Sequence, residues 1–582
     1  MRLILHYLKR YKGWFVLDFL SVFGFALAEL GLPTMVAEMI DGGIMQGDPA
    51  AIWQAGRVCA VIAVVGVAGT VLLGFCCARL STNITADIRE EVFRKAQTFS
   101  HAEFGKFGIA SMITRTNNDA FQIQLFLNAL FRTALMTPVM MCASFILTLR
   151  ASPRLSVIVI ATFPLIVLGV VLVSKWSRPV SEQQQTSQDN MNRITRENLT
   201  GVRVVRAFNN DAREQARFEA ENERYTKASR RMFKLMMMTQ PVFFLVMNFA
   251  VCLIFWFGGH LLQLGQIEIG QLTAFMDYLF HAMFSILMFS MVFMIYPKAA
   301  VSARRIQAVL DTQPLVQDPK DGETLSGPVE EITFSHVSFT YPEGGGEILH
   351  DISLSIRRGE TVAFVGSTGS GKSALVSLLP RFYDVTKGSV RVNGTDVRQF
   401  HLQSLRRAIG FVPQKAFLFS GTIADNIRFG KEDATDEEVV HAAQVAQAED
   451  FIRAKPGGFA APIAENAANV SGGQRQRLSI ARALVRKPAV YVFDDSFSAL
   501  DFQTDLKLRR ALRKETGDAI VLIVAQRIST VMDADRIFVL DHGSIVGQGR
   551  HEELLDTCPV YREIAASQLN TAELAGGKGV LS

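Results

Sequence analysis

Cysteine, histidine and net charge are all scarce in this chain of 582 residues. Its six cysteines form no CxxC pair and no group with histidine, so the sequence predicts neither a zinc site nor a disulfide framework. Lysine and arginine number 60 against 55 acidic residues, which gives a net charge of +5. So small an excess over so long a chain gives no reason to expect a nucleic-acid partner. Charged residues make up 20% of the chain, fewer than the ~25% of typical soluble domains.

Apolar residues, by contrast, are abundant and gather in the first half of the chain. They account for 49% of it, and the mean hydropathy is +0.21. A bilayer core of ~30 Å needs about 20 mostly apolar residues per helix. Six runs reach this length and predict six transmembrane helices: Trp14–Ile40, Ala51–Ala78, Leu127–Arg150, Leu155–Trp176, Pro241–Leu264 and Leu272–Tyr296.

The charges around these runs predict how the chain lies in the membrane. Met1–Lys12 mixes apolar and basic side chains, so we expect a short amphipathic helix on the cytosolic surface. The loop around Asp41 and Asp48 has no lysine or arginine, and the positive-inside rule therefore places it outside. The prediction is a multi-pass protein of the cell membrane (plasma or inner), with both termini cytosolic and no cleavable signal peptide.

Two connections between the predicted spans are much longer than the others. Residues 79–126 and 178–240 are charged and have little proline, so we expect them to continue as helices into the cytosol and to turn at their far ends. The transmembrane domain, including these extensions and the amphipathic helix, is expected to cover residues 1–310.

The second half of the chain has the composition of a soluble domain. A polar linker is predicted over residues 311–330, and a flexible tail over 571–582. Between them, over 331–570, buried strands such as Thr361–Val365 and Ala489–Phe493 alternate with helices, which is typical of an α/β domain.

A phosphate-binding motif lies in this α/β domain. Residues 366–373 read GSTGSGKS, follow a predicted strand and open a predicted helix, which is the context of a P-loop. Lys372 can reach the β- and γ-phosphates of a nucleotide, and the Ser373 hydroxyl can bind Mg²⁺. The residues whose backbone N–H groups can cradle the phosphates are Gly366, Ser367, Thr368, Gly369, Ser370 and Gly371. The sequence therefore predicts a site for ATP and Mg²⁺.

Two acidic residues follow a second buried strand. Asp494 falls at the end of the sequence VYVFD, where it can help to hold Mg²⁺, and Asp495 falls where a general base would lie. Strands that end in acids are common, so this element is weak evidence alone. Between it and the P-loop lies Val470–Arg477, which reads VSGGQRQR.

These motifs together resemble the ATP-binding cassette (ABC) transporters, whose signature is close to LSGGQ. The resemblance implies that Tyr341 stacks on adenine, that Gln414 is a Q-loop residue near Mg²⁺, and that Asp501 belongs to the D-loop. In such a dimer the signature of one chain completes the nucleotide site of the other. The residues that would do so here are Ser471, Gly472, Gly473 and Gln474.

The membrane half resembles the exporter-type half-transporters of this family. Residues 108–119 and 197–208 are similar to the two cytosolic extensions, and 258–270 to the region between the last two spans. The implied fold class is an α-helical six-span transmembrane domain followed by an α/β P-loop ATPase domain, acting as a dimer that couples ATP hydrolysis to transport.

Two residues depart from the family's usual pattern. Asp495 stands where a catalytic glutamate is usual and is one methylene shorter, and Gln526 stands at the position of the switch histidine. Glutamine cannot become cationic or shuttle a proton, and a misplacement of about 1 Å can cost about a hundredfold in rate. We therefore predict a site that binds ATP and hydrolyses it slowly. The chain thus resembles the degenerate-site subunit of heterodimeric multidrug exporters. The opposite interpretation, in which Gln526 still bonds phosphate and Asp495 acts as the catalytic acid, stays open.

The substrate is only broadly indicated. The last predicted span is rich in methionine and phenylalanine, which suits hydrophobic or amphiphilic compounds, drug-like or lipid. Asp277 and His281 share a helix face there, and Glu29 lies in the first span. Ionisable groups within a membrane indicate a polar cavity. The alternative is that they lie near the outer interface, where they cost little free energy. We predict export by one half of a heterodimer. A homodimeric lipid or drug exporter, an exporter-fold siderophore importer and an ATP-gated regulatory subunit are the alternatives.

Overall fold

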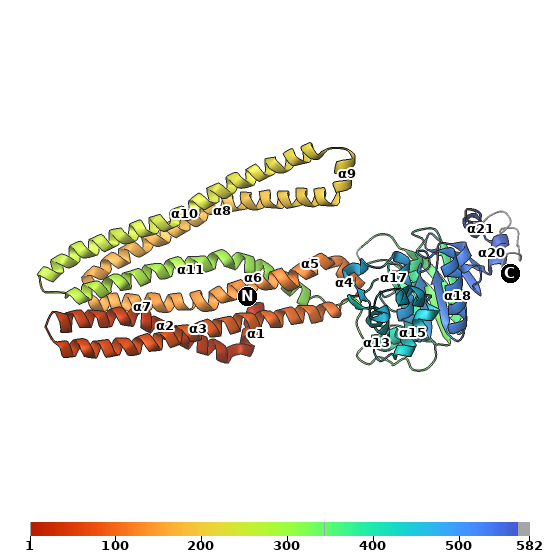
Figure 1. The fold of residues 1–582 in the computed structure, drawn as a ribbon, viewed down its shortest axis with the longest axis horizontal. Coiled ribbons are helices and arrows are strands. Elements are labelled where there is room, and N and C mark those ends of the chain that lie inside the picture. The colour runs from red at the N-terminus through yellow and green to blue at the C-terminus, as the bar shows by residue number, and fades with distance from the viewer. Residues whose placement is uncertain (1, 343, 569–582) are drawn as a thin grey trace. The chain divides into compact units, whose positions relative to one another are not determined.

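The computed structural model describes residues 2–342 and 344–568, so the predicted tail lies outside the described residues. The chain forms two compact units (Figure 1). The first joins the residues up to 96 with 110–312, and the second joins 97–109 with the residues from 313 onward.

The first unit consists of long apolar helices. Among the residues that the structure describes, six helical segments are long and apolar enough to cross a membrane, and each predicted span falls on one of them, which confirms the six-span prediction. These segments are Ile4–Ile44, Pro49–Gln97, Ile109–Ala151, Pro153–Thr200, Asp211–Gln263 and Ile269–Leu310. At ~1.5 Å per residue, helices of this length extend well beyond a ~30 Å bilayer core.

Within these segments the helices have the following bounds. The first overlaps α1 (Arg2–Leu8) and contains α2 (Lys12–Glu38), and the third contains α5 (Ile109–Thr114), α6 (Ala120–Ala129) and α7 (Met136–Ala151). The other four are single helices: α3 (Pro49–Gln97), α8 (Pro153–Thr200), α10 (Asp211–Gln263) and α11 (Ile269–Leu310). The predicted long connections are helical, with turns at α4 (His101–Phe107) and α9 (Val202–Ala207).

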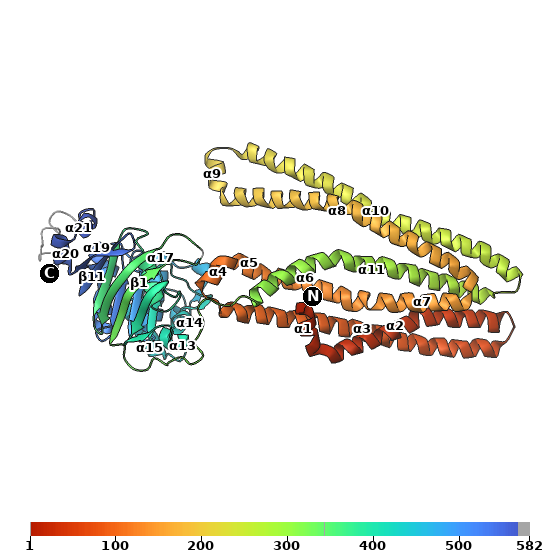
Figure 2. The same cartoon turned by 180° about the vertical axis from the view of Figure 1, so that it is seen from behind.

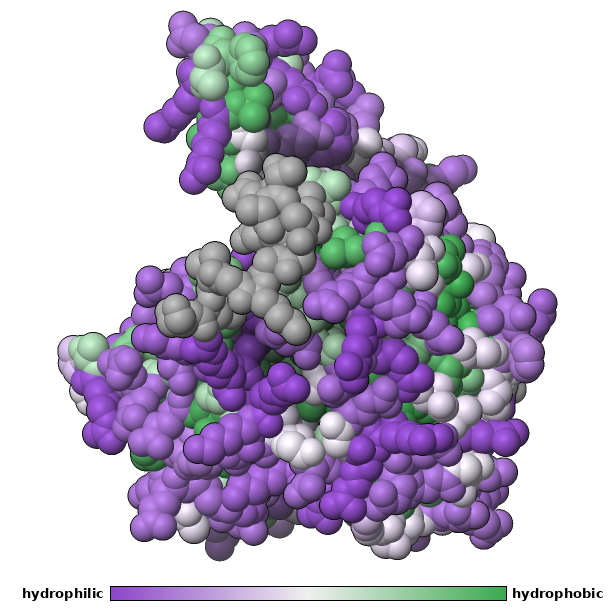
Figure 3. All heavy atoms as spheres, turned by 90° about the vertical axis from the view of Figure 1, so that its right-hand side faces the viewer, coloured by the Kyte–Doolittle hydropathy of each residue, from purple (hydrophilic) through white to green (hydrophobic). Residues whose placement is uncertain are grey.

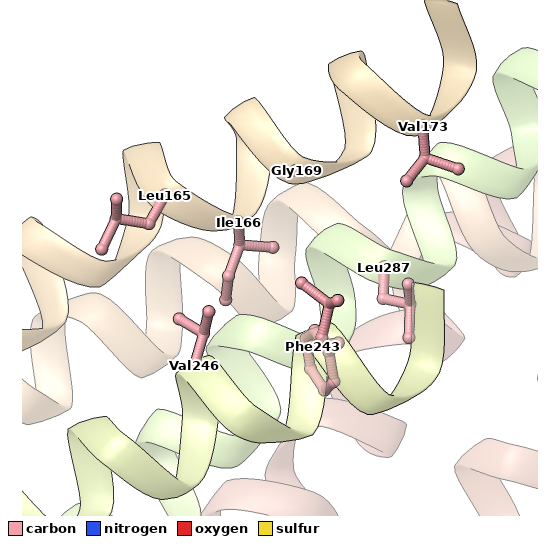
Figure 4. A pocket seen from close by; sticks show the side chains of 8 residues that line it. Leu165, Ile166, Gly169, Val173, Phe243, Val246 and Leu287 are labelled. Carbon is pink, nitrogen blue, oxygen red and sulfur yellow. The ribbon is translucent and has the colours of Figure 1, made fainter. Parts of the chain in front are cut away.

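The helices of the first unit pack in two groups. α8 and α10 lie along each other and, with α9 at their tip, form an arm that diverges from the remaining helices (Figures 1 and 2). α2 and α3 approach closely through small residues, because a Cβ atom on Gly69 would lie 2.9 Å from the Cα atom of Gly24. Between α8, α10 and α11 lies a small cleft lined entirely by apolar residues, among them Ile166, Phe243 and Leu287 (Figure 4).

The second unit is built on two principal sheets. One is antiparallel, in the order β2-β1-β4-β5: β1 (Glu331–Phe339), β2 (Leu349–Arg357), β4 (Lys387–Val392) and β5 (Thr395–Asp396). The other is mainly parallel, in the order β12-β11-β3-β10-β9-β6: β3 (Thr361–Gly366), β6 (Ile409–Val412), β9 (Val490–Asp494), β10 (Ile520–Val524), β11 (Arg536–Asp541) and β12 (Ser544–Gly549). A two-stranded pair is formed by β7 (Gly421–Thr422) and β8 (Pro462–Ile463).

Helices cover these sheets. They are α12 (Lys372–Leu378), α13 (Leu402–Arg407), α14 (Ile423–Arg428), α15 (Asp436–Val445), α16 (Glu449–Arg453), α17 (Gly472–Leu484), α18 (Phe502–Glu515), α19 (Ile528–Val531), α20 (His551–Thr557) and α21 (Pro559–Ala566). The predicted strands at 361–365 and 489–493 correspond to β3 and β9, whose residues are almost all buried. The face of this unit seen in Figure 3 is mostly hydrophilic, as expected of a domain in water.

The short helix α4 belongs to the second unit although it follows α3 in sequence. The His101 ring packs on Phe382 and Tyr383, with ring centroids 5.2 and 5.8 Å apart. The buried carboxylate of Glu103 accepts a hydrogen bond of 3.0 Å from the backbone N–H of Leu315. These contacts tie the turn after α3 to the soluble domain.

Candidate functional site

The P-loop lies between β3 and α12 and depends on glycine. At Gly366 a Cβ atom would lie 2.1 Å from the carbonyl oxygen of Leu540. Gly371, the residue before α12, has a left-handed φ of 95°, and a Cβ atom there would lie 2.7 Å from the Leu349 side chain. Larger residues would therefore strain or displace this loop. The result is a tight turn of backbone at a helix N-terminus, where anions are favoured.

Lys372 lies at the centre of this turn and is almost fully buried. Its ammonium group donates to the carbonyl oxygens of Gly366 and Ser367, at 2.8 and 2.7 Å, and to the Ser370 hydroxyl at 3.2 Å. Burial lowers the pKa of Lys372, and the nearby carboxylates of Asp495 and Asp494 act in the opposite direction. A buried ammonium beside a glycine-rich turn at a helix N-terminus has the chemistry of a phosphate site.

A hydroxyl and a carboxylate meet beside the P-loop. The Ser373 hydroxyl donates to Asp494 Oδ1 at 2.7 Å. Asp494 is the last residue of β9, and burial raises its pKa although the Ser373 bond lowers it. Two hard oxygen ligands at this place suit Mg²⁺, which is bound by few protein oxygens together with substrate phosphates.

Asp495 is held by two glutamine side chains. Its Oδ2 atom accepts hydrogen bonds from the side-chain amides of Gln414 and Gln526, both at 3.2 Å. The residue is buried, and this burial raises its pKa. Its φ is 45°, a left-handed conformation that aspartate tolerates better than most residues.

The order of the parallel strands explains why these residues meet. β3, β10, β9 and β6 are consecutive neighbours in the sheet and run in the same direction. Their carboxyl ends therefore share one edge, where ligands of open α/β sheets bind. The P-loop follows β3, Gln526 follows β10, the two aspartates lie at the end of β9, and Gln414 follows β6.

A further residue, which the sequence did not indicate, braces this site. The Gln568 side chain accepts a hydrogen bond of 2.9 Å from the Ile528 N–H and donates one of 2.8 Å to the Gln526 carbonyl oxygen. The oxygen and the nitrogen of the Gln568 side-chain amide thus both bind the segment that carries Gln526. Gln568 follows α21 and belongs to no motif, so sequence offers no signal for it.

The other predicted residues lie in separate parts of the domain. Tyr341 packs edge-on against Phe339 and Tyr383, with ring centroids 4.9 and 5.2 Å away. Ser471 precedes α17, and its hydroxyl accepts from the Gln474 N–H at 3.2 Å while the Gln474 side chain accepts from the Ser471 N–H at 3.1 Å.

This capping box also orders Gly472 and Gly473 in the first turn of α17. Asp501 precedes α18 in a similar way and accepts from the Thr504 N–H at 3.0 Å. The predicted signature and D-loop residues thus both lie at helix N-termini.

Comparison with known proteins decides the family. The model of the ABC transporter transmembrane region matches residues 15–305, and the ABC transporter model matches 349–498. The chain belongs to the ABC transporter family. An uncharacterised ABC transporter ATP-binding protein of Mycobacterium tuberculosis is 40% identical over 560 residues, which cover 94% of this chain and 95% of that protein.

Other relatives and a solved structure agree with this family. An ATP-dependent lipid A-core flippase of Syntrophus aciditrophicus is 32% identical over 82% of this chain and 79% of its own. A putative multidrug export protein of Bacillus subtilis is 32% identical over 84% of each chain. The structure of a bacterial Atm1-family ABC exporter with ATP bound aligns with a TM-score of 0.78 and 26% identity, covering 97% of this chain and 99% of that one.

The resemblance inferred from the sequence is thereby confirmed at the level of family and fold. This ABC transporter is an exporter-type half-transporter, with one six-span membrane domain and one ATPase domain. It is a multi-pass membrane protein, and its ATPase domain implies ATP binding and hydrolysis coupled to transport.

Proposed function

We propose that this ABC transporter exports hydrophobic or amphiphilic compounds as one half of a heterodimer, and that its own nucleotide site binds ATP and hydrolyses it slowly. The observation that carries the proposal is the hydrogen bond from Gln526 to Asp495. It joins the two residues that depart from the family's usual pattern, at the position where the attacking water would be activated.

The chemistry of this pair is unfavourable for hydrolysis. A general base must reach the proton it abstracts, within ~2.6–3.2 Å. Asp495 has the short side chain, and its Oδ2 atom is already engaged by Gln414 and Gln526. A glutamine amide can donate to phosphate but carries no positive charge and exchanges no proton. The site therefore retains binding groups and loses much of its catalytic power.

Nucleotide binding itself is well supported by the residues present. Gly366–Lys372 provide backbone N–H groups and a buried ammonium for phosphates, and the Tyr341 ring would stack on adenine. Ser373 and Asp494 would hold Mg²⁺, with Gln414 close by. When bound, Mg²⁺ would neutralise charge on the β- and γ-phosphates.

The signature supports a dimer with shared sites. The N-terminus of α17 favours anions, and its first turn is ordered by the Ser471–Gln474 capping box. We infer that Ser471, Gly472, Gly473 and Gln474 bind the γ-phosphate in the partner's nucleotide site, with Asp501 at the same interface. Since this signature retains its serine and both glycines, the partner's site would be the faster one.

The membrane domain supports export of amphiphiles. Two relatives carry names that refer to a lipid A-core flippase and to multidrug export, and both names are compatible with apolar substrates.

By the positive-inside rule the termini and the ATPase domain would be cytosolic, with the α2–α3 turn outside.

The mass of the native complex tests the partner. The chain is tagged, purified gently from its native cell, and the intact complex is weighed. A stoichiometric second half-transporter of different mass supports the proposal, whereas a complex of twice 64.3 kDa shows a homodimer and refutes it. Substrate movement that stops with vanadate-sensitive ATP turnover separates a pump from an ATP-gated subunit.

A further inference from the structure

Polar contacts along one seam join residues 29–41, at the C-terminal end of α2 and just beyond it, to the first turns of α11, which runs antiparallel to α2. Residue numbers rise along one helix as they fall along its antiparallel neighbour, so the two numbers of each contacting pair add to nearly the same value. The contacts are Asp41 with the N–H groups of Gly270 and Gln271 at 2.6 and 3.0 Å, Thr34 with Tyr278 at 2.6 Å, and Glu29 with His281 at 3.5 Å.

The Glu29–His281 pair lies deep within the membrane-spanning part. His281 is twelve residues from the start of α11, and Glu29 is twelve residues before Asp41, which contacts that start. At ~1.5 Å per residue, both are ~18 Å from this end of the seam. Since the bilayer core is ~30 Å thick, the pair falls near its middle. Ionisable groups at such depth are expensive and mark functional sites.

No fixed positive charge accompanies this carboxylate along the seam. Neither residues 13–56 nor residues 269–297 contain lysine or arginine. Asp277, which is exposed and one turn from His281 on the same face of α11, adds a second acid. An imidazole offers a hydrogen-bond partner but not the permanent charge of lysine or arginine. The seam therefore has a local excess of negative charge.

Two aromatic rings flank the pair. The rings of Phe280 and Phe284 stack with centroids 5.6 Å apart at 9°, and Phe280 also meets the edge of His281 at 5.7 Å. The faces of aromatic rings attract cations. The Glu29 side chain is 39% exposed and Phe284 38% exposed in this chain.

An apolar cleft begins nearby on the same helix. Phe280 and Leu287 are seven residues apart, which places them on one face of α11 about 10 Å from each other. Leu287 lines the cleft between α8, α10 and α11, together with Ile166 and Phe243 (Figure 4). Asp277, the two aromatic rings and the edge of the cleft thus follow one another along α11, and Glu29 on α2 adjoins them through His281.

We propose that Glu29 and His281, with the stacked rings of Phe280 and Phe284, bind the positively charged group of an amphiphilic cation whose apolar part packs against the apolar side chains around Leu287. This inference rests on the proposed export function and names its substrate class. The carboxylate supplies the opposite charge, the rings supply polarisable faces, and the apolar side chains around Leu287 contact the hydrocarbon.

Binding of a matched pair of probes tests it. The native complex in nanodiscs is titrated, without ATP, with tetraphenylphosphonium and with its uncharged analogue triphenylphosphine oxide. Glu29→Gln should weaken binding of the cation about tenfold and that of the uncharged probe less than twofold; tenfold in affinity corresponds to about 1.4 kcal/mol. Glu29→Asp keeps the charge and should retain most of the affinity. Glu38→Gln, an exposed acid on the same helix, is the matched control and should change neither.

Three results overturn the inference. They are equal cation binding by wild type and Glu29→Gln, an equal loss of both probes in that variant, and no cation binding by the wild type. Because no ATP is present, a complex that never pumps can still pass this test. A genuine exporter that binds only uncharged compounds fails it, so the two proposals fail separately.

Discussion

Replacing Asp495 with glutamate and Gln526 with histidine should accelerate ATP hydrolysis at this chain's own site. Glutamate extends the carboxylate by one methylene, and histidine replaces an amide that now donates to Asp495 Oδ2 at 3.2 Å. The first change moves the base toward its target, and the second supplies a group that can carry a proton and a positive charge.

The expected magnitude follows from the geometry. A carboxylate that is displaced by about one bond length loses about a hundredfold in rate, and a well-placed general base contributes ~10²–10⁴-fold. Because Gln414 also donates a hydrogen bond to Oδ2, the loss of that bond offsets part of the gain in rate. We expect Asp495→Glu alone to raise the rate about 10–100-fold, which lowers the barrier by about 1.4–2.7 kcal/mol.

Phosphate release by the purified native complex in lipid measures this rate. Each variant is compared with the same variant carrying Lys372→Ala, which removes the ammonium proposed to bind phosphate and so measures the turnover that does not depend on this site. Nucleotide affinity is measured in parallel. Unchanged turnover in the double variant with ATP binding intact would refute the reasoning, as would a wild-type site already as fast as the variant.

Two further predictions concern the stability of this site. Burial raises the pKa of Asp495, so its ionised form destabilises the folded domain at neutral pH. Asp495→Asn should therefore raise the melting temperature of the domain at pH 7. The gain should vanish as the pH falls through the folded-state pKa to below about 3.9, where both states are protonated. A gain that persists at acid pH would contradict this. Gln568→Ala removes two hydrogen bonds to the segment that carries Gln526, and each bond stabilises the fold by ~0.5–1.5 kcal/mol. The variant should therefore show faster exchange of the backbone amide of Ile528. Unchanged exchange there would show that Gln568 does not brace Gln526.

Much of the fold and part of the site could be predicted because the signals are local. A span needs ~20 apolar residues in succession, and the P-loop needs glycines at fixed spacing between a strand and a helix. Asp495 and Gln526 were also recognisable, because each stands at a known distance from a motif. The expected linker, domain boundaries and heterodimer partner stay predictions.

The sequence by itself determined the six membrane spans and the order of the two domains, and it indicated the residues that we propose cradle phosphate, since each signal depends on neighbours a few positions away. Only the tertiary structure decided which distant residues meet. Gln414 and Gln526 both reach Asp495 because three parallel strands end at one edge of a sheet. Glu29 faces His281 because two helices 250 residues apart pack antiparallel in one register, and pairing across such separations leaves no trace in local composition.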